Sequence, residues 1–157
     1  MEYIRVRSED KERIDVVYSI LKTCGWNMAK KFLFHWIPPY SRRRIRRDTQ
    51  TKDVMLVWDD SLMAYTSTFQ MFINADGNLY TRKIATLPKY EGRGIGKSNL
   101  VYMENYAREI GCPKICLDVY AKSTNAINFY LHNGFVVVGR KRSIRFEELV
   151  MEKQINI

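Results

Sequence analysis

The sequence predicts a mixed α/β or α+β domain with helices on both faces of one sheet. From Val54 onward, β-branched and aromatic runs separated by turns indicate strands. These strands are expected at residues 54–58, 62–73 and 79–87. A glycine-rich turn follows, and behind it apolar residues spaced three and four apart indicate a helix from about Ile95 to Gly111. Strands and helices that alternate in this way favour a sheet-based fold.

Length and composition limit the classes of protein to which this chain can belong. The chain has 157 residues, of which 46% are hydrophobic and 27% charged, so we expect one soluble domain over 1–157. It contains no apolar run of membrane-spanning length and no apolar signal segment, which predicts a cytoplasmic protein. Cys24, Cys112 and Cys116 form no CxxC pair and have no histidine at zinc-ligand spacing, so buried free thiols are expected.

The N-terminal third is expected to be helical after a short strand at 3–6. Ser8 is suited to cap a helix whose apolar face ends at Gly25. Residues 26–37 then predict a second, aromatic-rich helix that Pro38 ends. An irregular basic stretch should follow up to Asp53.

The C-terminal third predicts three strands and one short helix. Strands are expected at 114–120, 135–139 and 148–155, with irregular basic sequence before the last one. The helix should start at a cap formed by Ser123 or Thr124 and end at Gly134.

The formal net charge of +9 implies attraction for anions without naming one. Much of it lies in SRRRIRRD, with five arginines in six positions: Arg42, Arg43, Arg44, Arg46 and Arg47. Such a run is most often the solvated face of a short helix or loop. Nucleic acid, an acidic acceptor and the phosphates of a cofactor remain alternatives.

The turn EGRGIGKS at 91–98 is suited to hold a phosphate-containing ligand. A mononucleotide P-loop would need glycine where Glu91 stands, and a dinucleotide fingerprint would need glycine where Lys97 stands. A pyrophosphate bound by backbone N–H groups at a helix start needs only closely spaced glycines and a helix behind them. The turn meets that requirement.

Two motifs occur in order between about Leu79 and Phe135. The first is EGRGIG from Glu91, and the second is NAINFYLHNGF from Asn125, with Ala126 directly after the asparagine. Together they resemble the GNAT superfamily of acetyl-CoA-dependent N-acetyltransferases, whose motifs are Q/R-x-x-G-x-G/A and N-x-x-A-x-x-F-Y-x-x-x-G-F. Glu91 departs from the glutamine or arginine of the first motif, so we expect its side chain to point away or to pair with Lys89 or Arg93.

The resemblance implies a mostly antiparallel central sheet of six to seven strands, with a splayed strand pair that holds coenzyme A. Tyr130 matches the family's general acid, which protonates the departing thiolate. No metal is implied. The cofactor-binding residues it implies are Ile84, Ala85, Thr86, Glu91, Gly92, Arg93, Gly94, Ile95, Gly96, Lys97, Asn125, Phe129 and Tyr130.

The implied reaction transfers an acetyl group from acetyl-CoA to a primary amine by direct attack in a ternary complex. Residues 78–87 contain no acid that could serve as the base, so water, or Asp76 or Asp118, would take the amine proton. By analogy with the family, the acceptor wall would use residues of the first two helices. The candidates are Trp26, Phe34, His35, Trp36 and Tyr40, although each one alone also suits an aromatic core or a helix surface.

The acceptor itself cannot be identified from these motifs and is a small molecule or a peptide. The alternative function is a non-catalytic basic module of the same fold that binds acyl-CoA or RNA. We expect a monomer or homodimer, with no membrane partner and no nucleic-acid partner.

Overall fold

The computed structural model describes residues 1–156, which form four α-helices, a short 3-10 helix and a seven-stranded sheet. The strand order is β1-β2-β3-β4-β5-β7-β6. β4 pairs with β5 in parallel, whereas β1 with β2, β2 with β3, β5 with β7 and β6 with β7 pair antiparallel. The predicted mixed, mostly antiparallel sheet is confirmed.

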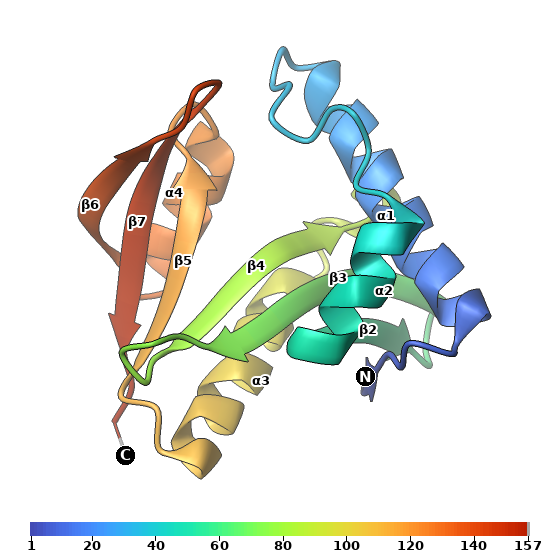
Figure 1. The fold of residues 1–157 in the computed structure, drawn as a ribbon, viewed down its shortest axis with the longest axis horizontal. Helices are drawn as coiled ribbons and strands as arrows, with labels where there is room; N and C mark the ends of the chain where they lie inside the picture. Colours follow the sequence, from blue (N-terminus) through green and yellow to red (C-terminus); the bar gives the residue numbers. More distant parts are fainter. Residues whose placement is uncertain (157) are drawn as a thin grey trace. The chain divides into compact units, whose positions relative to one another are not determined.

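The chain divides into two compact units. The first combines Met1–Phe72 with Arg82–Gly96, and the second combines Ile73–Thr81 with the residues from Lys97 onward. The first contains β1 (Glu2–Arg5), α1 (Lys11–Ala29), α2 (Arg42–Thr51), β2 (Asp53–Asp59), most of β3 (Ala64–Ile73), the end of β4 (Leu79–Thr86) and the 3-10 helix η1 (Pro88–Tyr90). Figure 1 shows α1 and α2 beside β2 and β3.

α1 is one continuous helix, and the predicted break at Gly25 is wrong. Asp10, rather than Ser8, caps it, because the Asp10 carboxylate accepts a hydrogen bond of 3.1 Å from the Arg13 N–H. Gly25 is buried inside the helix, where a Cβ would lie 3.1 Å from the Trp36 carbonyl oxygen. The glycine therefore permits a close approach of Trp36 and does not end the helix.

The expected aromatic helix over 26–37 is also wrong. α1 ends at Ala29, and the chain then turns at Phe32, which has a φ of 64°. A left-handed residue cannot continue a right-handed helix, so this phenylalanine occupies the conformation that a helix-ending glycine usually takes.

α2 replaces the irregular stretch expected before Asp53. Ser41 caps it by accepting a 3.2 Å hydrogen bond from the Arg44 N–H. Ile45 and Asp48 are its buried residues, while its five arginines are exposed. Ile45 is the single apolar residue of α2, so the sequence lacks the apolar repeat at three- and four-residue spacing that indicated the other helices.

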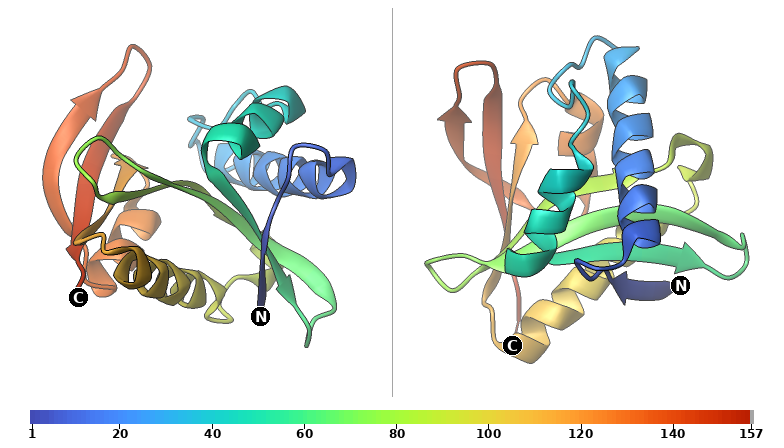
Figure 2. Two further views of the ribbon diagram at one scale, coloured as in Figure 1. Left: turned by 60° about the horizontal axis from the view of Figure 1, so that its bottom comes forward. Right: turned by 45° about the vertical axis from the view of Figure 1, so that its right-hand side comes forward.

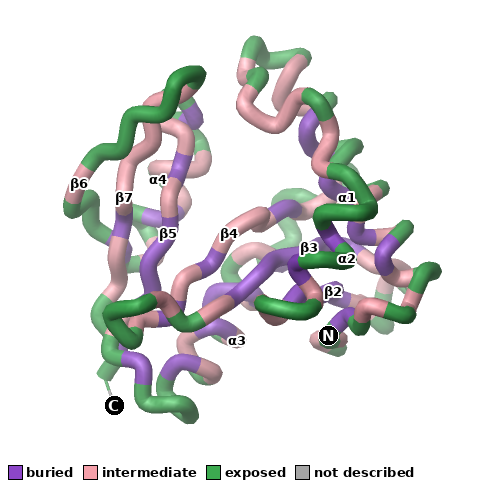
Figure 3. Tube along the Cα trace, viewed as in Figure 1, coloured by how far each residue is buried: buried purple, intermediate pink, exposed green. Residues whose placement is uncertain are grey.

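The core of the first unit lies between α1, α2 and the strands. Its buried members are Val6, Ile14, Val17, Ile20, Leu21, Cys24, Ile45, Val54, Leu56 and Ala85. Trp36 and Tyr40 pack against it from the segment between the two helices. Figure 3 shows the buried residues on the neighbouring strands of this unit.

The second unit contains α3 from Lys97 onward (Ile95–Ile110 in full), β5 (Lys114–Tyr120), α4 (Thr124–His132), β6 (Val136–Arg142) and β7 (Glu147–Gln154). β7 lies between β5 and β6, as Figure 2 also shows. Arg140, Lys141 and Arg142, expected to be irregular, pair with Leu149, Glu148 and Glu147. The helix from Ile95 and the strand over 148–155 are confirmed to within a residue or two.

All three cysteines are free and buried, as predicted. Burial raises the pKa of the Cys24 thiol to about 12 and that of Cys116 to about 11. Neither thiol is therefore a ready nucleophile near neutral pH.

Candidate functional site

The glycine-rich turn enters α3 with backbone N–H groups that remain available. Gly92 and Gly94 both have a φ of 78°, and a Cβ on either would meet nothing within 4 Å. Among residues 1–156, the N–H groups of Gly92, Arg93 and Gly94 donate to no acceptor. The first turn of α3 contains no acid, and the first N–H groups of any α-helix lack intrahelical partners. Unpaired N–H groups at a helix start are donors suited to an anion.

Glu91 does not obstruct that arrangement. Its side chain is exposed, and its N–H donates to the Pro88 carbonyl at 3.2 Å. Of the two alternatives expected for this side chain, the ion pair with Lys89 or Arg93 is not formed within the described part of the chain. Its negative charge acts on Cys24, where it adds to the effect of burial in raising the pKa of the thiol.

β4 leads to the turn and carries an irregularity that the sequence did not reveal. Lys83 has a φ of 51°, so a left-handed residue interrupts the pleat of the strand. Of the three residues that follow, Ala85 is buried in the core of the first unit, and Ile84 and Thr86 are half-buried. The Thr86 carbonyl accepts a hydrogen bond of 3.3 Å from the Cys24 thiol.

The second motif forms α4, in the second unit. Tyr130 is buried, and its ring lies 5.3 Å from that of Phe129 and 5.6 Å from that of Phe135, centroid to centroid. Burial raises the pKa of the Tyr130 hydroxyl above its usual range. The group therefore stays protonated at neutral and mildly alkaline pH.

The start of α4 distinguishes Ser123 from Asn125. Ser123 is the N-cap residue and is 8% exposed, and its hydroxyl has no hydrogen-bond partner among residues 1–156. Asn125 is exposed in the first turn. When the family pattern N-x-x-A-x-x-F-Y is aligned on Tyr130, Ser123 occupies the position of the asparagine. The adjacent pair Asn125-Ala126 obscured this signal in the sequence.

The five aromatic candidates for an acceptor wall separate into two groups, all within the first unit. Trp26 and Phe34 are each 50% exposed. His35, Trp36 and Tyr40 are half-buried and gather around Lys83. The Lys83 ammonium lies 5.5 Å from the centroid of the Trp36 ring and 4.5 Å from that of the Tyr40 ring.

His35 is held neutral by this environment. Burial, and next the positive charge of Lys83, lower the pKa of its imidazole to about 4. At pH 7 the ring is uncharged but is a weak base, so it is suited to hydrogen bonding more than to proton abstraction.

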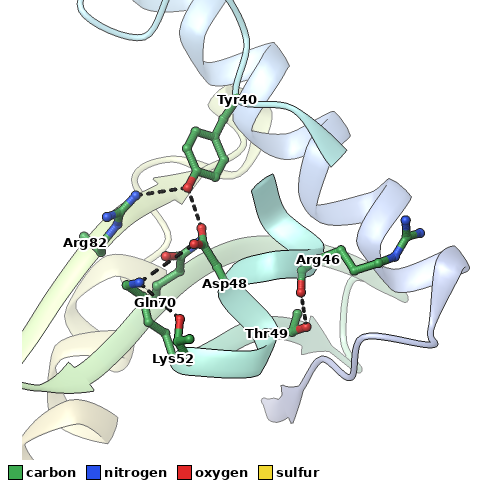
Figure 4. A network of polar contacts seen from close by, with 8 residues as sticks. Tyr40, Arg46, Asp48, Thr49, Lys52, Gln70 and Arg82 are labelled. Carbon is green, nitrogen blue, oxygen red and sulfur yellow. Dashed lines mark hydrogen bonds and ion pairs between the residues drawn. The ribbon is translucent and has the colours of Figure 1, made fainter. Parts of the chain in front are cut away.

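Tyr40 joins α2 to β4 through a polar network (Figure 4). Its hydroxyl donates to Asp48 Oδ2 at 2.5 Å and accepts from Arg82 Nη2 at 3.2 Å. Asp48 Oδ2 also accepts from Gln70 Nε2 at 3.1 Å, and Lys52 Nζ lies 3.8 Å from Asp48 Oδ1. Burial, and next the hydrogen bond to Asp48, raise the pKa of Tyr40 to about 12.

The two acids considered as bases differ in their surroundings. Asp76 is exposed in the turn before β4, whereas Asp118 on β5 accepts from the Tyr80 hydroxyl and lies 3.1 Å from Lys141 Nζ. Both carboxylate oxygens of Asp118 are therefore engaged. The described residues contain no group of three or more His, Cys, Asp or Glu side chains suited to a metal ion, and none of their helices is long and apolar enough to cross a membrane.

A family model decides the classification. Residues 16–135 match the model described as the Acetyltransferase (GNAT) family, which is more than half of the chain. The chain belongs to the GNAT acetyltransferase family. A search of curated protein sequences found no match.

Solved structures share the GNAT fold at low sequence identity. PaiA N-acetyltransferase from Thermoplasma acidophilum, in complex with coenzyme A, is 20% identical over 98% of each chain, with a TM-score of 0.78. The ribosomal-protein-S18-alanine N-acetyltransferase from Escherichia coli is 15% identical, with a TM-score of 0.76, over 99% of this chain and 94% of its own. These likenesses support the fold of this GNAT protein.

Within this GNAT protein, the two units carry different parts of the predicted residue set. Ile84 to Gly96 and the aromatic candidates belong to the first unit, and Lys97, Asn125, Phe129 and Tyr130 belong to the second. Sequence reasoning missed Lys83, Ser123 and Asp48. A left-handed lysine and a buried aspartate on a basic helix have no local sequence pattern that reveals them.

Proposed function

We propose that this GNAT protein is an N-acetyltransferase, with the whole chain 1–157 acting as one domain. It would transfer the acetyl group of acetyl-CoA to a primary amine by direct attack in a ternary complex. The observation that carries the proposal is the turn at Gly92 and Gly94, whose N–H groups have no acceptor among residues 1–156 and which leads into a helix with no acid in its first turn. Such a turn suits the diphosphate of coenzyme A.

Each group of residues has a proposed role. The N–H groups from Gly92 to Lys97 bind the diphosphate, and the backbone of Ile84, Ala85 and Thr86 holds the pantetheine arm, with one N–H polarising the thioester carbonyl. Acetyl-CoA, when bound, supplies that thioester, whose C–S bond breaks as the C–N bond to the amine forms.

Tyr130 gives its proton to the departing sulfur, and its raised pKa means that the hydroxyl is protonated at neutral pH before the reaction begins. Asn125, Phe129 and the buried Ser123 contact the coenzyme. Water takes the amine proton, because Asp118 is occupied by Lys141 and Tyr80.

The direct test measures coenzyme A release from acetyl-CoA by the purified protein over amines, polyamines, aminoglycosides, amino acids and peptides. We expect at least one acceptor to give saturable release. Acetyl-CoA at 100 times its Kd should also stabilise the protein by about 2.7 kcal/mol, whereas ATP with magnesium should not. Stabilisation by ATP alone, with no release from acetyl-CoA, would refute the proposal.

The exposed arginines of α2 favour a second candidate, a non-catalytic basic module that binds RNA. Two of them are already engaged, since Arg42 Nε lies 2.7 Å from Asp15 Oδ1 and Arg46 Nε donates to the Ser8 carbonyl at 3.2 Å. We therefore expect no tight RNA complex at physiological salt. A gel-shift assay that found sub-micromolar RNA binding without acetyl-CoA turnover would favour the second candidate.

A further inference from the structure

Positive groups surround the Tyr40 ring. Besides Lys83 at 4.5 Å, the guanidinium carbons of Arg44 and Arg82 lie 5.7 and 5.8 Å from its centroid. Arg44 comes from α2, and Arg82 and Lys83 come from the part of β4 in the same unit. Side chains from separate elements thus bring positive charge to one place.

The nearby acid does not balance this charge. Asp48 is buried and is engaged by Tyr40, Gln70 and, more distantly, Lys52. Asp48 carries one negative charge, whereas Arg44 and Arg82 bring two positive charges to the Tyr40 ring. Within residues 1–156, neither Arg44 nor Arg82 forms an ion pair.

A ligand can reach these groups from solvent. Arg44 is exposed and Arg82 is half-buried, and in Figure 4 the Arg82 guanidinium extends from β4 to the Tyr40 hydroxyl. That hydrogen bond fixes the direction of the side chain while using one of its five N–H donors. A partly desolvated guanidinium held in place is well suited to bind a carboxylate or a phosphate with two parallel hydrogen bonds.

We propose that Arg82 and Arg44, with Lys83, bind an anionic group, a carboxylate or a phosphate, on the amine that this protein acetylates. The acceptor is then an amine that carries a negative charge elsewhere in the same molecule. This inference rests on the proposed acetyltransferase function and narrows it to a class of substrate.

Other arginines of α2 provide matched controls. Arg43 and Arg47 are exposed on the same helix and make no ion pair or ring contact within the described residues. Removing either charge lowers the net charge by the same amount as removing Arg82. A specific site and a diffuse positive field therefore predict different results for Arg82→Gln and Arg47→Gln.

The experiment compares amines that differ only in the anionic group. The phosphate pair is O-phosphoethanolamine and ethanolamine, and the carboxylate pair is β-alanine and β-alanine amide. In at least one pair, we expect the charged amine to have a kcat/KM at least tenfold higher, mainly through a lower KM. The pair that shows the difference identifies the anionic group.

The variants test where that preference arises. Arg82→Gln should reduce kcat/KM for the charged amine at least tenfold, which corresponds to about 1.4 kcal/mol. Arg82→Lys should restore part of it, and Arg47→Gln should stay within about twofold of the parent. Arg44→Gln, at an exposed position, gives a second test if Arg82→Gln does not fold.

Calorimetry separates failure of this inference from failure of the proposed function. O-phosphoethanolamine and β-alanine are titrated into the protein saturated with coenzyme A, in the parent and in Arg82→Gln. Binding that Arg82→Gln abolishes, without acetyl transfer to any amine, would uphold the anion site and refute the transferase. Equal kcat/KM within both pairs, or equal losses in Arg82→Gln and Arg47→Gln, would overturn the anion site and leave the transferase standing.

Discussion

The ammonium of Lys83 lies 4.5 Å from the centroid of the Tyr40 ring, although the Lys83 backbone is in the left-handed region with a φ of 51°. A non-glycine residue in that region costs about 1–2 kcal/mol. A partly desolvated cation on an aromatic face contributes about 0.5–2 kcal/mol. The ring contact thus offsets much of the backbone cost, and the conformation of β4 is coupled to the segment that carries Tyr40.

The coupling can be measured at His35. Because burial and then the Lys83 charge lower the pKa of His35 to about 4, Lys83→Met should raise it part of the way toward 6.5 and no further. The native state binds fewer protons than the unfolded state between about pH 4 and 6.5, so His35 contributes stability above pH 6.5 that is lost as the pH falls toward 4. NMR titration of the imidazole protons is the measurement, and an unchanged midpoint in Lys83→Met would contradict the assignment.

Tyr40→Phe should destabilise the protein while keeping the ring. Asp48, which is buried, would lose the donor at 2.5 Å, and a buried acceptor deprived of a partner costs about 1–3 kcal/mol. Tyr18→Phe is the control, because its ring also contacts a cation, with Arg42 at 4.0 Å, and its hydroxyl has no hydrogen bond within residues 1–156. Urea unfolding should show the loss in Tyr40→Phe alone, and equal midpoints would contradict a role for the hydroxyl.

Gly94→Ala should weaken coenzyme A binding far more than Gly77→Ala. Both glycines are exposed, have a φ of 78° and have no neighbour within 4 Å of a built Cβ. Both substitutions should therefore cost about 1–2 kcal/mol of folding stability. A methyl group at 94 would in addition obstruct a diphosphate on the turn. Calorimetric Kd values that change equally in the two variants would reduce the turn at 92–94 to a purely structural element.

Tyr130→Phe should fold normally and transfer acetyl groups slowly. The ring contacts with Phe129 and Phe135 persist, whereas the loss of the proton donor should lower kcat by a factor on the order of 10² to 10⁴. Because burial raises the pKa of Tyr130, the parent should lose no activity through its ionisation between pH 6 and 9. Tyr18→Phe, which also removes one tyrosine hydroxyl, is the reference variant. If the kcat of Tyr130→Phe stays within about twofold of the parent, Tyr130 has only a packing role.

Strands and the two late helices were predictable because their patterns are local. Runs of β-branched and aromatic residues separated by turns mark β2 to β4, and apolar spacing marks α3. The helix boundaries near the N-terminus were not predictable, because they depend on distant contacts. Gly25 lies inside α1, where it permits the close approach of Trp36, and the left-handed turn after α1 is at a phenylalanine, which the sequence does not mark as a helix end.

Part of the candidate site was predictable for a similar reason. The turn at Gly92 and Gly94 and the ring of Tyr130 belong to contiguous motifs, so their spacing revealed them. The charges around Tyr40 come from α2 and β4, with about 40 residues between Arg44 and Arg82, and only the fold brings them together. In the sequence, Arg44 lies in a basic run and Arg82 lies in a segment with an ordinary strand pattern.

Because β4 is divided between the two units, the first unit can be completed only late in synthesis of the chain. Neither unit is a continuous stretch of chain, because Ile73–Thr81 belongs to the second unit and Arg82–Gly96 returns to the first. The core around Ile14 and Leu56 includes Ala85, so it is incomplete when only the first 72 residues have left the ribosome. A nascent chain must wait until Gly96 has emerged before its first unit is complete, and no single proteolytic cut can release either unit intact.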